Sequence, residues 1–162
     1  SPGTPSMADV AERRESHRVK QLSLFLPQRR GELLSVTRIL EGQRIRVCAL
    51  SIIDAADHAV ARLIVDRPTL AGTSLIAEGY HIFETDLLCI DLPDGVGIAP
   101  ALKAMLMAEL NVSYVYTLQH DFGRKTALAL HVTNLVMAED VATEQGLRLL
   151  NQDDLLDVDG PL

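Results

Sequence analysis

Two glycine-containing turns have the clearest potential for chemistry in this sequence, because each follows an alternating apolar stretch and precedes a helical one. The first is Pro27-Gln28-Arg29-Arg30-Gly31, and the second is Pro93-Asp94-Gly95-Val96-Gly97. At the start of a helix the first backbone N–H groups have no partner within the helix, and the helix dipole is positive there. A carboxylate is a natural ligand for such a position. Gly31 and Gly97 lack a Cβ and would let that ligand approach the backbone closely.

The same turns also have a purely structural interpretation. A glycine between a strand and a helix can serve only the geometry of the turn, and a single such turn is a weak signal, whereas two in matching positions are a stronger one. Arg29 and Arg30 could pair with a ligand carboxylate or lie on a solvated surface. Asp94 could accept from an amino group or cap the helix. The residues alone leave these alternatives open.

The elements that must position the turns occur twice. Three apolar residues alternate with other residues before each turn: Leu22, Leu24 and Leu26 before the first, and Leu88, Ile90 and Leu92 before the second. The two triplets and the two final glycines are separated by the same sequence interval. The chain is therefore predicted to be a tandem repeat of two units of about 65 residues each.

Hydrophobic periodicity predicts the order strand, helix, strand, strand, helix, strand in each unit. In the first unit we expect strands at 19–26, 45–53, 60–65 and 80–83, and helices at 31–40 and 66–78, the second capped by Asp66. In the second unit we expect strands at 87–92, 112–118, 125–132 and 147–150, and helices at 98–106 and 135–145. Ile98, Leu102, Met105 and Leu106 are expected to form the apolar side of the first of these two helices.

This order predicts an α+β protein of two tandem ferredoxin-like βαββαβ domains, each with a four-stranded antiparallel sheet and both helices on one face. The domains are expected at 18–84 and 85–151, after a disordered or frayed arm at 1–17 and before an acidic tail at 152–162 with little to bury. The connection Glu84-Thr85-Asp86 is too short for a flexible linker. Because unpaired strand edges tend to pair, we expect one continuous sheet within the chain and a homodimer beyond it.

Both units resemble an ACT domain, the amino-acid-binding regulatory module. The first unit carries the resemblance in Gly31-Glu32-Leu33, 45–54 and 62–66, and the second in Gly97 with its helix, 111–116 and 127–130. The likeness extends from Val19 to about Asn151. It is closest to the small stand-alone proteins of two tandem ACT domains that are acetolactate-synthase-related but contain no synthase catalytic domain.

The resemblance implies a ligand at an interface between ACT domains, held by the loop between the first strand and the first helix and by the strand that follows. In the first unit these residues are Gln28, Arg29, Arg30, Gly31, Glu32 and Leu33, with Leu50 and Ser51 opposite. In the second unit they are Asp94, Gly95, Val96, Gly97 and Ile98, with Tyr114 and Tyr116. Arg30 and Val96 depart from the family pattern, which commonly has proline before the ligand-facing glycine. From the residues alone, the two tyrosines could line an apolar pocket or pack a dimer interface.

Composition and spacing argue against several other functions. The net charge is −7 and there is no Trp, so no basic surface for nucleic acid is indicated. The five histidines lack metal-ligand spacing, and Cys48 and Cys89 lie in apolar strands where free cysteines are usually buried. No phosphate loop, nucleophile elbow or dinucleotide fingerprint is found, so we predict no catalytic residue, metal or cofactor. No apolar run reaches the roughly 18 residues of a membrane span, and a cytoplasmic location is expected.

The predicted function is therefore a non-catalytic regulatory protein that binds a free amino acid. Aliphatic strand faces favour a branched-chain amino acid, whose binding would be transmitted to assembly or to a partner enzyme of amino-acid metabolism. The alternative is a structural, dimerising module or a regulatory subunit of the acetolactate-synthase type that binds no ligand. A small ferredoxin-like enzyme would need a polar catalytic cluster that the sequence does not show.

Overall fold

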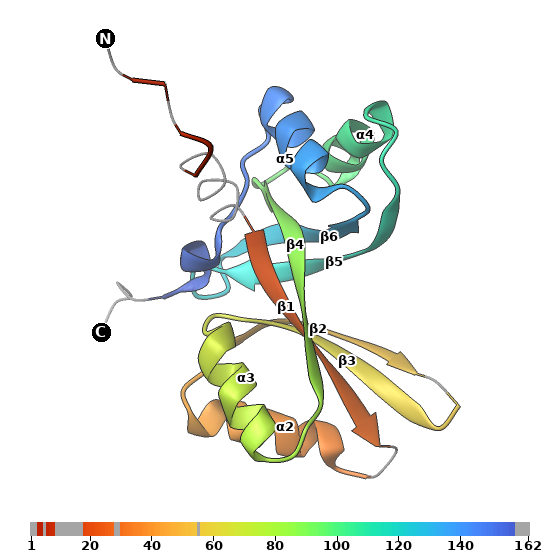
Figure 1. Cartoon of the computed structure of the whole chain (residues 1–162), viewed down its shortest axis with the longest axis vertical. Helices are drawn as coiled ribbons and strands as arrows, with labels where there is room; N and C mark the ends of the chain where they lie inside the picture. Colours follow the sequence, from red (N-terminus) through yellow and green to blue (C-terminus); the bar gives the residue numbers. More distant parts are fainter. Residues whose placement is uncertain (1–2, 5, 9–17, 28–29, 55, 158–162) are drawn as a thin grey trace.

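The computed structural model describes residues 3–4, 6–8, 18–27, 30–54 and 56–157. Its elements are, in order, β1 (Arg18–Pro27), α2 (Glu32–Gly42), β2 (Val47–Asp54), β3 (His58–Val65), α3 (Pro68–Ala77), β4 (Ile82–Leu92), α4 (Ala99–Met107), β5 (Val112–His120), β6 (Lys125–Val132), α5 (Leu135–Glu144) and the 3₁₀ helix η1 (Gln152–Leu155). Helices α2 and α3 lie at one end of the molecule and α4 and α5 at the other, with the strands between them (Figure 1). The predicted α+β fold of two tandem units is confirmed.

All six strands belong to one antiparallel sheet, in the order β2-β3-β1-β4-β6-β5. The expected continuous sheet is therefore confirmed. Strand β4 belongs to both units, since Leu88 lies opposite Arg18 on β1 and also opposite Leu130 on β6. The prediction of separate strands at 80–83 and 87–92, joined by Glu84-Thr85-Asp86, was wrong. Those three residues continue the strand because they pair with β1 along their whole length.

The strand expected at 147–150 is reduced to a single bridge between Ile90 and Leu149. Two backbone hydrogen bonds of 2.9 Å flank it, from the amide of Asp91 to the carbonyl of Arg148 and from the amide of Leu150 to the carbonyl of Cys89. Strand β1 occupies this edge of β4 as far as Leu88. Only the last few residues of β4 therefore remain available to the segment that follows α5.

One face of the sheet is covered by helices. On the other face, the half of the sheet from the first unit packs against the half from the second. On the covered face, each unit has its own core: Leu22, Leu24 and Leu63 with α2 and α3 in the first, and Leu88, Ile90 and Leu130 with α4 and α5 in the second. A third buried cluster lies on the other face and takes residues from both units, among them Val19, Ile64, Leu87, Leu118 and Leu155. The edge strands β2 and β5 contact each other. The sheet therefore folds over around this third cluster, which we call the interface core.

Two details of the predicted helices were wrong. Arg67, not Asp66, is the N-cap of α3, because the Asp66 carboxylate accepts instead from the amide of Arg46 at 2.9 Å. On α4, Leu106 is 76% exposed. The helix turns Ala101, Ala104 and Met105 towards the sheet in its place, and the two alanines let its backbone approach closely.

The C-terminal segment is part of the fold rather than a tail. Asn151 and Asp154 form a reciprocal capping box at the start of η1, and Leu155 is fully buried in the interface core. The Gln152 side chain accepts from the amide of Lys20 and donates to the carbonyl of Val65, both at 3.0 Å. These contacts fix the segment against both β1 and β3. Most of the predicted arm at 1–17, and residues 158–162, lie outside the described residues.

Candidate ligand-binding site

The two glycine loops lie at opposite ends of the molecule. Strands β1 and β4 lead into them and run antiparallel, with Leu24 opposite Ile82 and Arg18 opposite Leu88, so the loop after Pro27 and the loop after Leu92 point apart (Figure 1). The interface between the two units is formed by the helix-free sheet face. A single ligand cannot contact both loops of one chain, and a domain interface at either loop would have to be supplied by a second chain.

In the first loop, Gln28 and Arg29 lie outside the described residues. Arg30 and Gly31 are exposed, and Gly31 is the N-cap of α2 with a left-handed φ of 85°. The side chain of Glu32 accepts from the hydroxyl of Tyr80 at 2.9 Å, and Leu33 packs against the core of the first unit. These contacts hold α2 against the rest of its own unit.

The two residues expected opposite the first loop do not share a face. Leu50 pairs with Leu63, which belongs to the helix-covered core, whereas Ser51 pairs with Arg62 on the other face. Successive side chains of a strand point to opposite sides of a sheet. Leu50 and Ser51 are therefore not brought together around one ligand within the chain.

The second loop borders a cavity of about 160 Å³. Val96 and Gly97 line it on one side, and residues 146–148, which follow α5, line it on the other. Its wall is mostly apolar: Ile90, Leu92, Pro93, Pro100, Ala101, Gly146 and Leu147. Asp94 and Gly95 are exposed outside it, and Ile98 is the N-cap of α4. Of the residues predicted for this site, the structure thus brings Val96 and Gly97 to a cavity.

Two charged residues that sequence analysis missed complete this cavity. The Asp91 carboxylate lies 4.0 Å from the Arg148 guanidinium and 3.6 Å from Nε2 of His120. Helix α4 starts beside them without a side-chain cap, and Pro100 in its first turn has no N–H. The cavity therefore combines an apolar wall with the uncapped amides of α4, while the charged ends of Asp91 and Arg148 meet at its edge, on the side of His120. The strand predicted at 147–150 was the one signal in this region, but the sequence did not indicate which strand it would pair with, so it could not place Arg148 beside Asp91.

Tyr114 and Tyr116 lie at the interface between the two units of one chain. The alternatives from the sequence were an apolar ligand pocket and a dimer interface. Both tyrosines pack against the interface core and bond to Gln21 of β1. The Arg62 guanidinium lies 3.6 Å from the centre of the Tyr114 ring, whose other neighbour is the stacked ring of His131 at 4.8 Å. The two tyrosines join β5 to β1 and β3 within one chain.

The cysteines and the wider chain give two further findings. Cys48 and Cys89 are free and buried in the interface core, as predicted, and burial raises the pKa of both thiols. Among the described residues, no group of three or more His, Cys, Asp or Glu side chains is placed to hold a metal ion. In the same part of the chain, every helix is too short or too polar to span a membrane.

Comparison with known proteins places this geometry in a family. A family model described as an ACT domain pair matches residues 17–158. The crystal structure of protein BT0572 from Bacteroides thetaiotaomicron is similar, with 27% identity, a TM-score of 0.78, and coverage of 87% of this chain and 97% of that one.

Two regulatory subunits of aspartate kinase share the fold at lower identity. The protein from Thermus thermophilus is 18% identical, with a TM-score of 0.55 and coverage of 78% of this chain and 91% of its own. The protein from Thermus flavus is 13% identical, with a TM-score of 0.50 and coverage of 80% and 93%. No curated protein matches the chain. Because the family model spans nearly the whole of the described sequence, this chain belongs to the family of ACT domain pairs.

Proposed function

We propose that this chain is a non-catalytic regulatory protein that binds a small apolar amino acid in the cavity beside the second glycine loop. The observation that carries the proposal is the meeting of Val96 and Gly97 with the uncapped start of α4 and residues 146–148 around one apolar cavity. The uncapped amides of α4 suit a ligand carboxylate.

The size of the cavity supports an aliphatic ligand. Its volume is about 160 Å³, and an apolar cavity of about 150 Å³ is enough to hold a molecule the size of benzene. The side chain of a branched-chain amino acid is of this order and would contact Ile90, Leu92 and Ala101, which line the wall. Burial of those methyl groups would supply most of the affinity.

The route from ligand to partner is proposed to run through the C-terminal segment. Residues 146–148 border the cavity and lead directly to η1, whose Leu155 is buried between the units. A ligand that bridges α4 and residues 146–148 would favour the docked segment, by no more than its differential affinity for the docked and undocked states. The proposed partner is an enzyme of amino-acid metabolism. It is either acetolactate synthase, to which the tandem ACT proteins that the sequence resembles are related, or an enzyme of the kind named for the aspartate kinase subunits.

The proposed assembly is a homodimer through an apolar patch formed by Phe25, Ile53, Val60 and Phe83. Phe25 pairs with Val60, Val60 pairs with Ile53, and the rings of Phe25 and Phe83 meet edge to face at 5.6 Å. The patch continues the sheet face that carries the interface core. In the second unit, Leu118 and Ala127 pair with each other as Ile53 and Val60 do in the first. These two residues are buried in one cluster with Leu155. Leu155 covers the apolar sheet face of the second unit. A second copy of the chain would cover the corresponding exposed face of the first unit in the same way.

A thermal-shift panel of the twenty amino acids at millimolar concentration tests ligand binding. Binding to the native state alone must raise the melting temperature, and we expect the rise for branched-chain amino acids. The Gly97→Leu variant should lose it, because a Cβ at Gly97 meets no atom within 4 Å and its side chain would occupy the cavity. Gly42→Leu is the matched control at an equally open glycine on α2. Flat curves for the wild type, or an undiminished rise in Gly97→Leu, would overturn the proposal.

Flat curves would favour the alternative, a structural module or regulatory subunit that binds no ligand. The exposed patch around Phe25 and Phe83 is the observation that supports this second candidate, since it offers an interface without any ligand. Light scattering in the absence of amino acids separates the two readings. A dimer that forms equally well with and without ligand, together with flat thermal curves, fits the module alone.

A further inference from the structure

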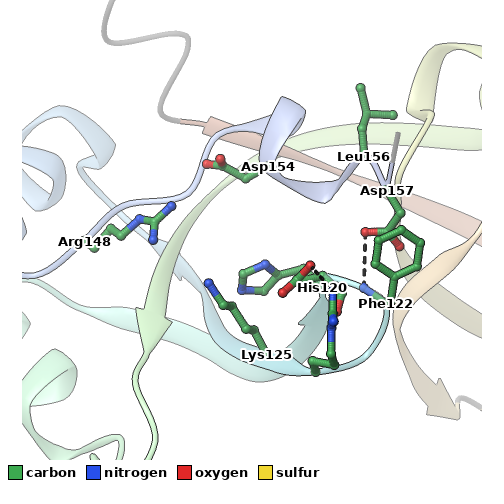
Figure 2. A pocket seen from close by; sticks show the side chains of 9 residues that line it. His120, Phe122, Lys125, Arg148, Asp154, Leu156 and Asp157 are labelled. Atoms are coloured by element: carbon green, nitrogen blue, oxygen red, sulfur yellow. Dashed lines mark hydrogen bonds and ion pairs between the residues drawn. The ribbon is translucent and has the colours of Figure 1, made fainter. Parts of the chain in front are cut away.

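We propose a second small-molecule site in this chain, for a small oxyanion with a carboxylate or phosphate group, in the polar cavity between the β5–β6 turn and the C-terminal segment. The cavity has a volume of about 310 Å³. Figure 2 shows that the ring of His120 and the side chains of Lys125 and Arg148 extend into it, with Asp154 of η1 on the opposite wall. It is distinct from the apolar cavity beside the second glycine loop, although Arg148 borders both.

Most acidic groups around the polar cavity already have partners. Asp121 pairs with Arg124 at 3.0 Å. Asp157 pairs with Arg46 and also accepts from the backbone amide of Phe122 at 3.2 Å. These carboxylates are neutralised by their own partners, so they oppose a bound anion only weakly.

The basic groups, in contrast, are largely uncommitted. Lys125 makes no ion pair within the described part of the chain, and it is exposed at the mouth of the cavity. The nearest carboxylate to Arg148 is that of Asp91, at 4.0 Å, which is too long for a hydrogen bond. Two cationic side chains thus border one cavity with donors to spare.

His120 is the strongest indication that a ligand is missing from this cavity. The residue is only 4% exposed, and its Nε2 is buried without a hydrogen bond to any described residue. A carboxylate oxygen of Asp91 lies 3.6 Å from this nitrogen, which is too long for a hydrogen bond. Buried polar side chains in folded proteins nearly always have a partner, so an orphan of this kind needs an explanation. A bound oxyanion beside the ring would provide one.

The backbone holds the three side chains in place before any ligand arrives. His120 and Lys125 lie opposite each other at the end of the β5–β6 ladder. The backbone of Arg148 is fixed to β4 by the 2.9 Å hydrogen bond from the amide of Asp91. An oxyanion has several acceptor oxygens and can accept from all three side chains at once through charge-assisted hydrogen bonds. Two carboxylates face this group. Oδ2 of Asp154 accepts from the amide of Asn151 at 2.8 Å. The Asp91 carboxylate lies 3.6 Å from His120 and 4.0 Å from Arg148, outside the cavity lining.

Isothermal titration calorimetry of the full chain with inorganic phosphate and, separately, with succinate tests the proposal and distinguishes the two sources of the oxyanion. We expect saturable binding of at least one probe, weakened by roughly tenfold or more in Lys125→Gln because one charge-assisted bond is lost. Lys103→Gln removes another exposed lysine, on α4 and outside the cavity, and should bind as the wild type does. Asp154→Asn should bind more tightly, since it removes one of the two facing negative charges and keeps an acceptor for the Asn151 amide.

Two outcomes would overturn this site. One is the absence of saturable binding of both probes at millimolar concentration. The other is an equal loss of affinity in Lys125→Gln and Lys103→Gln, which would indicate unspecific attraction to positive charge. Lys125→Gln should leave the thermal shift by apolar amino acids unchanged, because Lys125 does not border the apolar cavity. Failure of the oxyanion site is therefore distinguishable from failure of the amino-acid site.

Discussion

The hydroxyl of Tyr116 donates to Oε1 of Gln21 at 2.6 Å, across the sheet faces that no helix covers. Nε2 of the same glutamine donates to the hydroxyl of Tyr114 at 2.9 Å, and Gln21 is only 1% exposed. Both ends of a buried amide on β1 are thus satisfied by β5, which belongs to the other unit. Since a buried polar group without a partner is costly, this pairing favours one relative position of the two units.

Tyr116→Phe should lower the free energy of unfolding by about 1–3 kcal/mol, because it leaves Oε1 of Gln21 buried without that donor. Urea denaturation followed by circular dichroism measures the change. Tyr80→Phe is the matched control, since it removes a tyrosine hydroxyl whose partner, Glu32, lies nearer the surface. A loss in Tyr116→Phe no larger than in Tyr80→Phe would contradict a special role for the interface.

Stability should fall at alkaline pH, in part through Tyr116. Burial raises the pKa of its hydroxyl above the ordinary value of 10.0. The folded state then holds the proton more tightly than the unfolded state, so the contribution to stability is complete below about pH 10 and is lost as the pH rises towards the folded pKa. Urea midpoints between pH 7 and pH 11 should fall less steeply above pH 10 in Tyr116→Phe than in the wild type. Parallel curves would assign the loss to other groups, such as the buried Cys89 thiol.

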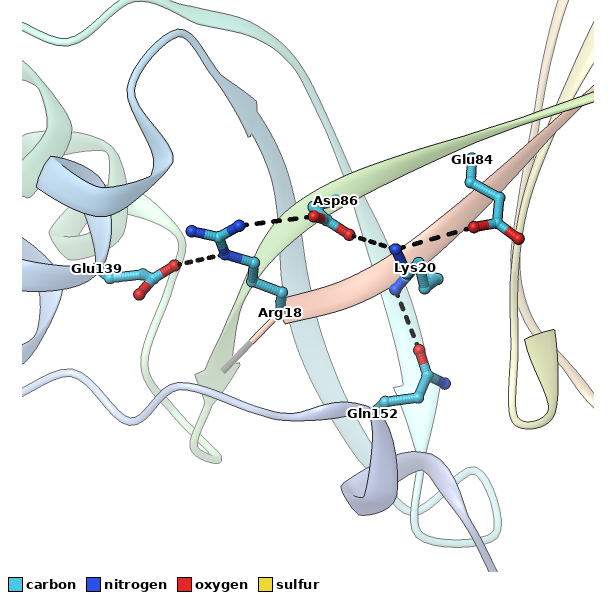
Figure 3. Close-up of polar contacts among 6 residues, drawn as sticks. All are labelled: Arg18, Lys20, Glu84, Asp86, Glu139 and Gln152. Atoms are coloured by element: carbon cyan, nitrogen blue, oxygen red, sulfur yellow. Dashed lines mark hydrogen bonds and ion pairs between the residues drawn. The ribbon is translucent and has the colours of Figure 1, made fainter. Parts of the chain in front are cut away.

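Arg18 provides a second link between the units, from β1 to α5. Its Nε lies 3.1 Å from a carboxylate oxygen of Glu139, a residue that is only 4% exposed (Figure 3). Arg18→Gln should cost about 1.5–3 kcal/mol of unfolding free energy, because the charge left behind is buried. Lys20→Gln breaks the neighbouring exposed pairs with Glu84 and Asp86 and should cost less than about 1 kcal/mol. Equal losses in urea denaturation would show that burial of Glu139 does not matter.

Much of the fold could be predicted from hydrophobic alternation. Leu22, Leu24, Leu88 and Ile90 are fully buried against helices, as the period of two predicts. The continuity of β4 could not be predicted, because Glu84 and Asp86 look like turn residues in the sequence. Their charges are matched by Lys20 on the paired strand, which is a tertiary contact without a local sequence signal.

The candidate site was predictable only in part. The two glycines at equal sequence intervals do not adopt equal conformations: Gly31 has a φ of 85°, whereas in the second loop it is Gly95, at 80°, that is left-handed. The position of the second loop could therefore be predicted from the sequence, but the backbone conformation of its glycines could not. Asp91 and Arg148 are distant in sequence and meet only because residues after α5 pair with the end of β4.

Leu155 shows why a polar composition can conceal a structural segment. Four aspartates dominate the last dozen residues of the sequence, yet this leucine is fully buried in the interface core. Leu155→Ala should lower the unfolding free energy by about 2–5 kcal/mol. Leu156→Ala, at the partly exposed neighbouring position, is the control and should cost less. If the two variants unfold at the same urea concentration, the segment is not part of the cooperative core.

The proposed homodimer can be tested at Phe83, which is 61% exposed and is the most exposed residue of the patch it forms with Phe25. Phe83→Ser should raise the dimer dissociation constant by about tenfold or more, since a buried aromatic anchor dominates an interface of this kind. Leu106→Ser, on α4 and away from the patch, removes an even more exposed apolar side chain and should leave assembly unchanged. Light scattering over a concentration series measures the mass. A wild-type monomer at high concentration, or the same mass curve for Phe83→Ser and wild type, would exclude this face as the interface.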